Sequence, residues 1–306
     1  MTLPGLTLDS LITNGCIFFF NQSGLDKRRD VWQQKLGRMP LNSIINWMLG
    51  VDKSKQPPEA ADAFMEVTAQ RDCMIKAMEK SLLAAGLSLP KGDLIRSEVR
   101  SFSEQESIWT RKFRFTGDKF GNISSTARAK CAADNLIDAA DQEWDPSRPK
   151  HKTCWLKLSS EEKELEILMT SSAPGVSRHH TGTDFDIGRK GAKGEKDLTA
   201  EAWTGSGDFA DAYRWLAPNA ATYGFIQPFD TKGGYGTGYT TERWHWSYYP
   251  IAQALLEYAR SHRAKIEDEL KRQWSDSTGK APRPEFKFIW DNWEQYLLNV
   301  EEKGVF

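Results

Sequence analysis

A long apolar stripe dominates the first third of the chain. After a Pro-Pro pair, the sequence predicts a helix from Glu59 to about Ala85, with Gly86 as a C-terminal stop. Apolar residues recur along this segment at close to helical spacing, so one face of the helix is apolar. These residues are Phe64, Val67, Met74, Met78 and Leu82. Two shorter helices are expected over residues 29–36 and 41–49.

The pattern changes near Leu87 to shorter elements. Residues 95–100 have the composition of a strand, and residues 103–113 that of a helix. Strands with segregated helices are typical of an α+β fold and not of an alternating, doubly wound one. We therefore expect two parts, a helical N-terminal region of unknown role over residues 1–88 and an α+β domain over residues 89–306.

Two further helices are expected in the second half of the chain. Asp208 can cap a helix that contains Phe209 and Leu216. Pro250 suits the first turn of a long helix that would end near Trp274.

Charge and hydropathy argue against two kinds of partner. The chain has 41 Lys and Arg residues against 42 Asp and Glu, a formal net charge of −1. This balance removes the electrostatic basis for a general nucleic-acid binder. The most apolar run, residues 16–20, is far shorter than the ~20 residues that span a bilayer. We therefore expect no nucleic acid and no membrane span.

The first residues and the cysteines bear on the compartment. Residues 1–5 contain no basic segment that leads into an apolar one, so we expect no secretory signal. Buried free thiols are the favoured interpretation of the scattered cysteines, and one or two disulfides formed in an oxidising destination are the alternative. The four cysteines are Cys16, Cys73, Cys131 and Cys154.

Three of the five histidines lie in two unusual polar segments. His179 and His180 occur in residues 173–186, whereas His245 occurs in residues 240–248. The two others, His151 and His262, are expected to be ordinary surface residues.

Two imidazoles and one carboxylate form a zinc site with a fourth position open for water. A nearby carboxylate outside the ligand set would act as general base. On a regular strand, however, His179 and Asp186 would lie on opposite faces, so a turn at Gly182 is needed. Glu242 and His245 likewise need an irregular backbone between them. Spacing alone leaves open whether these histidines bind a metal and which acid does what.

Four motifs occur in order across residues 92–250. They are Val99-Arg100-Ser101-Phe102-Ser103-Glu104-Gln105, Ser177-x-His179-x-x-Gly182-x-x-x-Asp186, Trp215-Leu216-x-x-Asn219-x-x-x-Tyr223-Gly224-Phe225 and Glu242-x-Trp244-His245-Trp246. Together they resemble the signatures of the VanY-like D-alanyl-D-alanine carboxypeptidases. That family belongs to a wider group of zinc peptidases that includes lysostaphin and the hedgehog signalling domain. The resemblance implies a hedgehog/DD-peptidase-like α+β fold whose central antiparallel sheet holds the metal.

The resemblance also implies roles for individual residues. His179, Asp186 and His245 would bind Zn²⁺. Glu242 would be the catalytic base and acid, and Arg100 would position the substrate and stabilise the oxyanion. Four further residues would bind substrate or lie beside it: Ser101, Gln105, Ser177 and Trp244. His180 is not assigned to the metal.

The sequence departs from the family pattern at several positions. Asp184 replaces the usual Ala, so it could compete for the metal or support a ligand from behind, although the family spacing favours Asp186. Arg243 replaces a Pro, and Phe229 falls where several relatives have a substrate-contacting Tyr. Residues 189–207 resemble an insertion beside the site. The insertion is interpreted as a surface loop, with a lid or a contact to anionic glycan as the alternative.

The function implied by the resemblance is zinc-dependent hydrolysis of peptidoglycan stem peptides with release of terminal D-alanine. One alternative is an L,D-carboxypeptidase or a lytic endopeptidase built on the same site. Another is a non-catalytic, zinc-stabilised cell-wall binding module. A third is an interaction protein in which the N-terminal helices are the functional part.

The expected lack of a signal leads to a hypothesis about delivery. The protein would be made in the cytoplasm and would act in the periplasm or at the cell wall. A dedicated secretion machine could deliver it as an antibacterial effector, for example by type VI secretion, or it could be a phage-like lysis enzyme. An effector would have a cognate immunity protein as a further partner.

Overall fold

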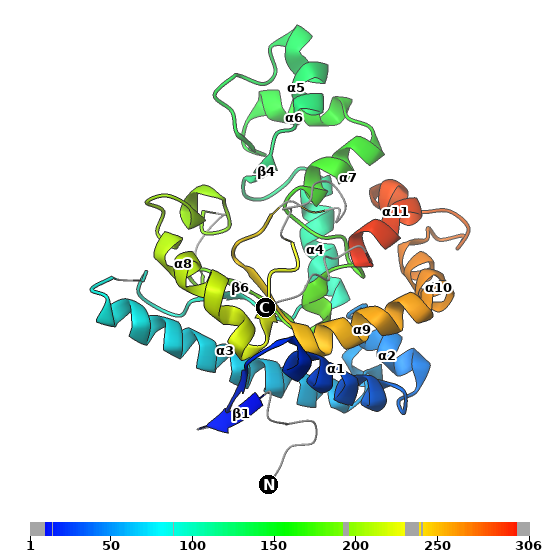
Figure 1. The fold of residues 1–306 in the computed structure, drawn as a ribbon. Coiled ribbons are helices and arrows are strands. Elements are labelled where there is room, and N and C mark those ends of the chain that lie inside the picture. Colours follow the sequence, from blue (N-terminus) through cyan, green and yellow to red (C-terminus); the bar gives the residue numbers. More distant parts are fainter. Residues whose placement is uncertain are drawn as a thin grey trace.

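A four-stranded antiparallel sheet lies at the centre of the fold. The computed structural model describes residues 10–13, 15–87, 89–191, 196–229, 239 and 241–298 (Figure 1). The strand order is β3 (Ile95–Ser97), β6 (Asp184–Ile187), β8 (His245–Tyr248) and β7 (Phe225–Ile226). All residues of β6 and β8 are buried, so every polar side chain on these two strands needs a partner. The antiparallel sheet together with separate helices confirms the predicted α+β class.

Helices surround the sheet, and two short hairpins are separate from its strand order. The hairpins are β1 (Ser10–Thr13) with β2 (Cys16–Phe19), and β4 (Phe120–Asn122) with β5 (Glu143–Trp144). The helices are α1 (Gln22–Leu36), α2 (Leu41–Met48), α3 (Glu59–Ala84), α4 (Phe102–Phe113), α5 (Ser125–Cys131), α6 (Pro149–Lys157), α7 (Ser160–Leu168), α8 (Ala210–Asn219), α9 (Tyr249–Ser261), α10 (Arg263–Trp274) and α11 (Lys287–Leu297). Among the described residues, every helix is too short or too polar to cross a membrane.

The N-terminal helices share one apolar core with the rest of the protein. Figure 1 shows α1 beside α9, and α3 running below α8. Trp32 of α1, Met74 of α3 and Leu255 of α9 are all buried in the same cluster. The predicted boundary at residue 88, which itself lies outside the described residues, therefore stays a prediction.

The long stripe forms the predicted helix, whereas two other helix predictions are wrong in detail. Glu59–Ala84 is a single helix with buried apolar positions. The predicted helix over residues 250–274 is broken at His262, because α9 packs on α1 while α10 turns to contact α11. Asp208 does not cap α8. Phe209 is the N-cap residue, and the Asp208 carboxylate pairs with Arg189 at 3.2 Å instead.

The favoured interpretation of the cysteines as free thiols is also wrong, and the alternative is confirmed, because all four cysteines form disulfides. Cys16 pairs with Cys73, and Cys131 pairs with Cys154. Tertiary packing explains the pairs: β2 lies against α3, and α5 lies against α6. The Cα atoms of each pair come within 5.9 and 5.7 Å, respectively, which is normal for a disulfide.

Residues 116–158 form a lobe that projects from the sheet (Figure 1). It contains the β4–β5 hairpin, α5 and α6, and its core is aromatic, with the Trp155 ring in contact with those of Phe120 and Trp144. His151, predicted at the surface, is buried in this lobe. Its ring contacts Asp141 at 3.0 Å and accepts the Asp145 N–H at 3.1 Å, so it is a structural residue.

Candidate metal centre

Pairing of β6 with β8 brings two predicted metal ligands together. Asp186 lies directly opposite His245 in the sheet, with 3.0 Å between Asp186 Oδ1 and His245 Nδ1. His179 comes from the 3₁₀ turn η3 (Arg178–Thr181), and its Nε2 lies 3.3 Å from Asp186 Oδ2. One donor atom from each of the three buried side chains lies within 4.8 Å of the others.

Two irregularities of the backbone make this arrangement possible, as the spacing required. Gly182 ends η3 with φ +70°, a conformation that glycine adopts without steric cost, and the chain reverses into β6. A turn before β8, in which the His245 N–H donates to the Glu242 carbonyl at 3.2 Å, brings Glu242 to the same side as His245.

Hydrogen bonds orient both histidine rings. His179 Nδ1–H donates to the Glu98 carbonyl at 2.9 Å, which leaves Nε2 directed at Asp186. His245 contacts Asp184 Oδ1 through Nε2 at 2.9 Å, which leaves Nδ1 directed at Asp186. Partners of this kind on the rear nitrogen are typical of metal-binding histidines.

The electrostatics differ sharply between the two rings. Burial and the nearby Arg100 guanidinium lower the pKa of His179 to about 4, so its ring is neutral near pH 7. Burial also opposes charge on His245, but its hydrogen bonds with Asp184 and Asp186 raise its pKa to about 9. Burial disfavours the charged form of Asp186 as well, yet the two histidines hold the pKa of Asp186 well below its usual range.

The chemistry of the donor set fits zinc. Two imidazole nitrogens and one carboxylate oxygen are zinc ligands, and three protein ligands leave a position open. The three side chains line a cleft of about 880 Å³, so that position would be open to a substrate. Ligand type by itself does not select zinc over other divalent ions.

Glu242 and Arg100 lie beside the three candidate ligands in the same cleft. Glu242 Oε2 lies 3.6 Å from His245 Nδ1, and the carboxylate is largely buried. Arg100 Nη2 lies 3.7 Å from Asp186 Oδ2. Ser97 Oγ accepts hydrogen bonds from Arg100 Nε and Nη2 at 3.2 and 2.5 Å, which fixes the guanidinium plane.

The four residues predicted to contact substrate have different surroundings. Ser177 is buried before η3 and lines the cleft, as does the half-buried Trp244. Gln105 lies behind Arg100, where its Oε1 accepts a hydrogen bond from Arg100 Nη1 at 2.7 Å. Its Nε2 donates to the Ser172 carbonyl at 2.6 Å. Gln105 is thus placed to position Arg100.

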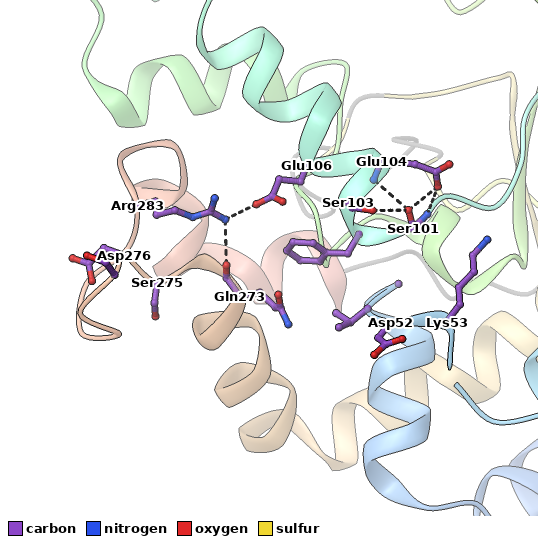
Figure 2. A pocket seen from close by; sticks show the side chains of 14 residues that line it. Asp52, Lys53, Ser101, Ser103, Glu104, Glu106, Gln273, Ser275, Asp276 and Arg283 are labelled. Carbon is purple, nitrogen blue, oxygen red and sulfur yellow. Dashed lines mark hydrogen bonds and ion pairs between the residues drawn. The ribbon is translucent and has the colours of Figure 1, made fainter. Parts of the chain in front are cut away.

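Ser101 faces a different pocket. Figure 2 shows its side chain with those of Ser103 and Glu104 in a polar pocket of about 840 Å³. Its hydroxyl caps α4 and accepts the Glu104 N–H at 3.2 Å, while the Glu104 carboxylate accepts the Ser101 N–H at 2.7 Å. This capping box uses the side chain that was predicted to contact substrate, and the structure does not bring it to the metal centre.

Sequence reasoning gave no site role to two residues close to the predicted ligands. His180 Nδ1–H donates to the Arg100 carbonyl at 2.8 Å, and Nε2 accepts the Gly175 N–H at 2.9 Å, so both nitrogens support the backbone. Tyr239 packs 4.8 Å from Phe229, whose ring lies 4.7 Å from that of His245. The polar environment of His179 and His180 was visible in the sequence, but no local pattern distinguishes a backbone-bound histidine from a ligand.

The cleft continues from the metal centre to the lobe. Lys119, Asn122 and Glu143 of the lobe line its far end. Leu198–Glu201, in the predicted insertion over residues 189–207, line one side, whereas residues 192–195 lie outside the described residues. The surface-loop interpretation is therefore incomplete, because part of this segment borders the site.

Fold and site define the chain as a metallopeptidase-type enzyme. A sequence model of the VanY family, described as D-alanyl-D-alanine carboxypeptidase, matches residues 66–251. Because the match covers more than half of the chain, the protein belongs to the VanY family of D-alanyl-D-alanine carboxypeptidases, and it is a carboxypeptidase.

Several solved structures are similar to the chain at low identity. The LdcB LD-carboxypeptidase is 20% identical, with a TM-score of 0.31, over 64% of this chain and 68% of that one. A variant of the vancomycin-resistance D,D-pentapeptidase VanY in complex with Zn(II) is 19% identical, with a TM-score of 0.30, over 62% and 76%. DacB from Streptococcus pneumoniae D39 is 20% identical, with a TM-score of 0.32, over 64% and 71%. No curated protein matches the chain.

Proposed function

We propose that the protein is a zinc-dependent D-alanyl-D-alanine carboxypeptidase that removes the terminal D-alanine from peptidoglycan stem peptides. The observation that carries this proposal is the convergence of His179, Asp186 and His245, with donor atoms within 4.8 Å, in a cleft that also holds Glu242 and Arg100. Membership of the VanY family supports the reaction type and the terminal dipeptide.

The residues of the chain divide the chemical work. Zinc held by the three ligands would supply Lewis acidity that activates water and polarises the scissile carbonyl. Glu242 accepts a proton from the attacking water and returns it to the leaving amine as the C–N bond breaks. Arg100, fixed by Ser97 and Gln105, binds the negative charge that develops on the carbonyl oxygen.

The substitution Glu242→Gln tests this assignment. It keeps the size of the side chain and leaves the three ligands in place, so zinc content stays near one per chain. Turnover falls by about 10²- to 10⁴-fold, because the proton acceptor is lost. Elemental analysis and mass spectrometry of alanine release from a pentapeptide stem measure both quantities. Glu201→Gln, the same change at another carboxylate of the cleft, is the matched control and keeps turnover. Wild-type turnover in Glu242→Gln would overturn the mechanism.

Defined substrates separate the proposed reaction from its alternatives. Loss of one alanine from a pentapeptide stem, abolished by chelation, supports the D,D-carboxypeptidase. Cleavage of a tetrapeptide stem alone indicates an L,D-carboxypeptidase, and internal cleavage indicates an endopeptidase. Stoichiometric zinc with no cleavage of any stem leaves the binding module. Absence of bound metal after incubation with zinc contradicts the site assignment.

We further propose that the protein acts in an oxidising compartment, the periplasm or the cell wall. The two disulfides support this, because such bonds persist mainly outside the reducing cytoplasm. Alkylation of the protein taken directly from its native cells tests the proposal. Four blocked cysteines are expected before reduction, and four reactive thiols would contradict it. Delivery by a secretion machine, an effector role and a cognate immunity protein stay predictions.

A further inference from the structure

Asp184 is a carboxylate buried directly behind His245. It lies on β6, two residues before Asp186 and opposite Ser247 of β8. Its side chain is fully buried, with 0% exposed. Oδ1 lies 2.9 Å from His245 Nε2, so Asp184 contacts the ring nitrogen that points away from Asp186.

Other donors saturate the Asp184 carboxylate. Arg178 Nε donates to Oδ1 at 2.7 Å, whereas the Thr183 and Ser247 hydroxyls donate to Oδ2 at 2.5 and 3.0 Å. Arg178 Nη2 also donates to Ser247 Oγ at 2.6 Å, which closes the network. The positive charge of the Arg178 guanidinium balances the negative charge of the Asp184 carboxylate. This second carboxylate therefore adds no net charge behind the metal centre.

The two nitrogens of His245 therefore have separate surroundings. Nδ1 lies 3.0 Å from Asp186 Oδ1 and 3.6 Å from Glu242 Oε2, on the side of the cleft. Nε2 lies against a carboxylate that Arg178, Thr183 and Ser247 already hold. A metal bound with His179 and Asp186 can meet His245 only at Nδ1.

We infer that Asp184 is a positioning residue for the metal centre. It accepts the Nε2–H of His245, which fixes the ring and its tautomer and leaves the Nδ1 lone pair for zinc. Arg178 and Ser247 in turn hold Asp184 in place. Carboxylate partners on the rear nitrogen of a metal-binding histidine orient the ring and raise its basicity. The inference rests on the proposed zinc function, and it assigns to Asp184 a supporting role, not that of a ligand.

Zinc affinity tests this inference without any use of activity. Asp184→Asn keeps the shape of the side chain but replaces the charged acceptor, and it is expected to weaken zinc binding by about 10- to 100-fold. Asp197→Asn, the same change at another buried carboxylate that pairs with an arginine, is the matched control. The Asp197 carboxylate pairs with Arg189 and lies outside the Asp184 network, so the zinc affinity of this variant stays close to that of wild type. Competition with a chromogenic chelator measures the zinc affinity of wild type and of both variants. Equal affinities for Asp184→Asn and wild type would overturn the inference, as would equal losses in the two variants.

A second measurement needs no variant. Heteronuclear NMR of the zinc-loaded wild-type protein, labelled in its histidine rings, identifies the metal-bound and protonated nitrogens of His245. The inference requires zinc on Nδ1 and a proton on Nε2. Zinc on Nε2 would overturn it while leaving the proposed function intact. If the wild-type protein binds no zinc, the proposed function fails together with the inference.

Discussion

Hydrogen bonds hold both the backbone and the guanidinium of Arg100. Both ring nitrogens of His180 bond backbone groups, one of them the Arg100 carbonyl. Gln105 accepts from Arg100 Nη1, and the Arg100 N–H donates to the His179 carbonyl at 3.0 Å. Gln105 and Ser97 bond the guanidinium itself and orient it before any substrate arrives, which is the condition for effective electrostatic stabilisation.

Two residues that the family resemblance treated alike are expected to behave differently on substitution. Gln105→Met removes the hydrogen bond to Arg100 Nη1, so kcat/KM is expected to fall by about tenfold, the equivalent of one net hydrogen bond to a charged group. Ser101→Ala removes an N-cap, so it lowers the free energy of unfolding by about 1 kcal/mol and leaves kcat/KM unchanged. Steady-state kinetics and urea unfolding measure the two effects. A loss of kcat/KM in Ser101→Ala as large as that in Gln105→Met would place Ser101 against the substrate.

Glu164 is a buried carboxylate of α7 that the proposed reaction does not use. Burial raises its pKa from the usual 4.5 to about 7, although it accepts hydrogen bonds from the N–H groups of Phe288 and Ile289 at 2.9 and 3.1 Å. The folded protein thus holds this proton more tightly than the unfolded chain. The resulting stabilisation is fully present below pH 4.5 and is lost as pH rises through about 7.

Glu164→Gln is expected to remove this pH dependence. The free energy of unfolding of wild type relative to Glu164→Gln falls by about 2 to 3 kcal/mol as pH rises from 4.5 to about 7. Urea unfolding of both proteins across that range measures the difference. The contributions of titrating groups that both proteins share cancel in it. A constant difference would mean that Glu164 titrates normally in the folded protein.

At the scale of elements, the end of α2 packs against the start of α4 and against His180. Gly50 follows α2 with φ +69°, and its carbonyl accepts the Phe102 N–H at 2.8 Å. A Cβ on Gly50 would lie 2.5 Å from His180 Nδ1 and 2.9 Å from the Phe102 nitrogen. No Cβ fits this junction without displacing the group that supports Arg100.

Gly50→Ala is therefore expected to destabilise the protein by more than its backbone conformation requires. Gly279 has nearly the same φ, +70°, but a Cβ there would meet no atom within 4 Å. Gly279→Ala should lower the free energy of unfolding only by the cost of a left-handed backbone at alanine, about 1 to 2 kcal/mol. Gly50→Ala adds the steric conflict, which lowers the free energy of unfolding by a further amount of about 1 to 3 kcal/mol. Equal losses of unfolding free energy in the two variants, measured with urea, would show that the residues at the junction between α2 and α4 move aside at little cost.

At the scale of the whole molecule, the N-terminal helices complete the core around the sheet. Leu25 and Trp32 of α1 are buried together with Ile251 and Leu255 of α9, and α9 follows directly from β8. Tyr248 of β8 donates to Glu66 of α3 at 3.0 Å. The strand that carries His245 is thus supported by the region that sequence analysis assigned to a separate part.

A chain that begins at residue 89 is expected to lose its cooperative unfolding transition. Removal of α1 and α3 uncovers the apolar side chains of α9 and leaves a large exposed surface in place of a core. Differential scanning calorimetry and zinc binding compare the shortened chain with the 306-residue chain. A cooperative transition with bound zinc in the shortened chain would establish the predicted boundary at residue 88.

Local patterns in the sequence determined the long helix, and the family resemblance named the candidate metal ligands. The helix over Glu59–Ala84 follows from apolar periodicity, which is a property of neighbouring residues. The turn at Gly182 was required by the spacing of His179 and Asp186, and the structure contains it. Motif order then identified His179, Asp186 and His245, which the fold brings together.

Only the tertiary structure decided which distant groups meet. Cys16 and Cys73 are 57 residues apart, and Asp184 is 61 residues from His245, so no local pattern could pair them. The burial of His151 likewise depends on how the lobe of residues 116–158 packs. Short-range periodicity and capping are encoded within a few residues, whereas strand register and helix docking decide contacts across the whole chain. The sequence by itself therefore determined the candidate metal ligands, and the packing of the sheet decided what holds each of them in place.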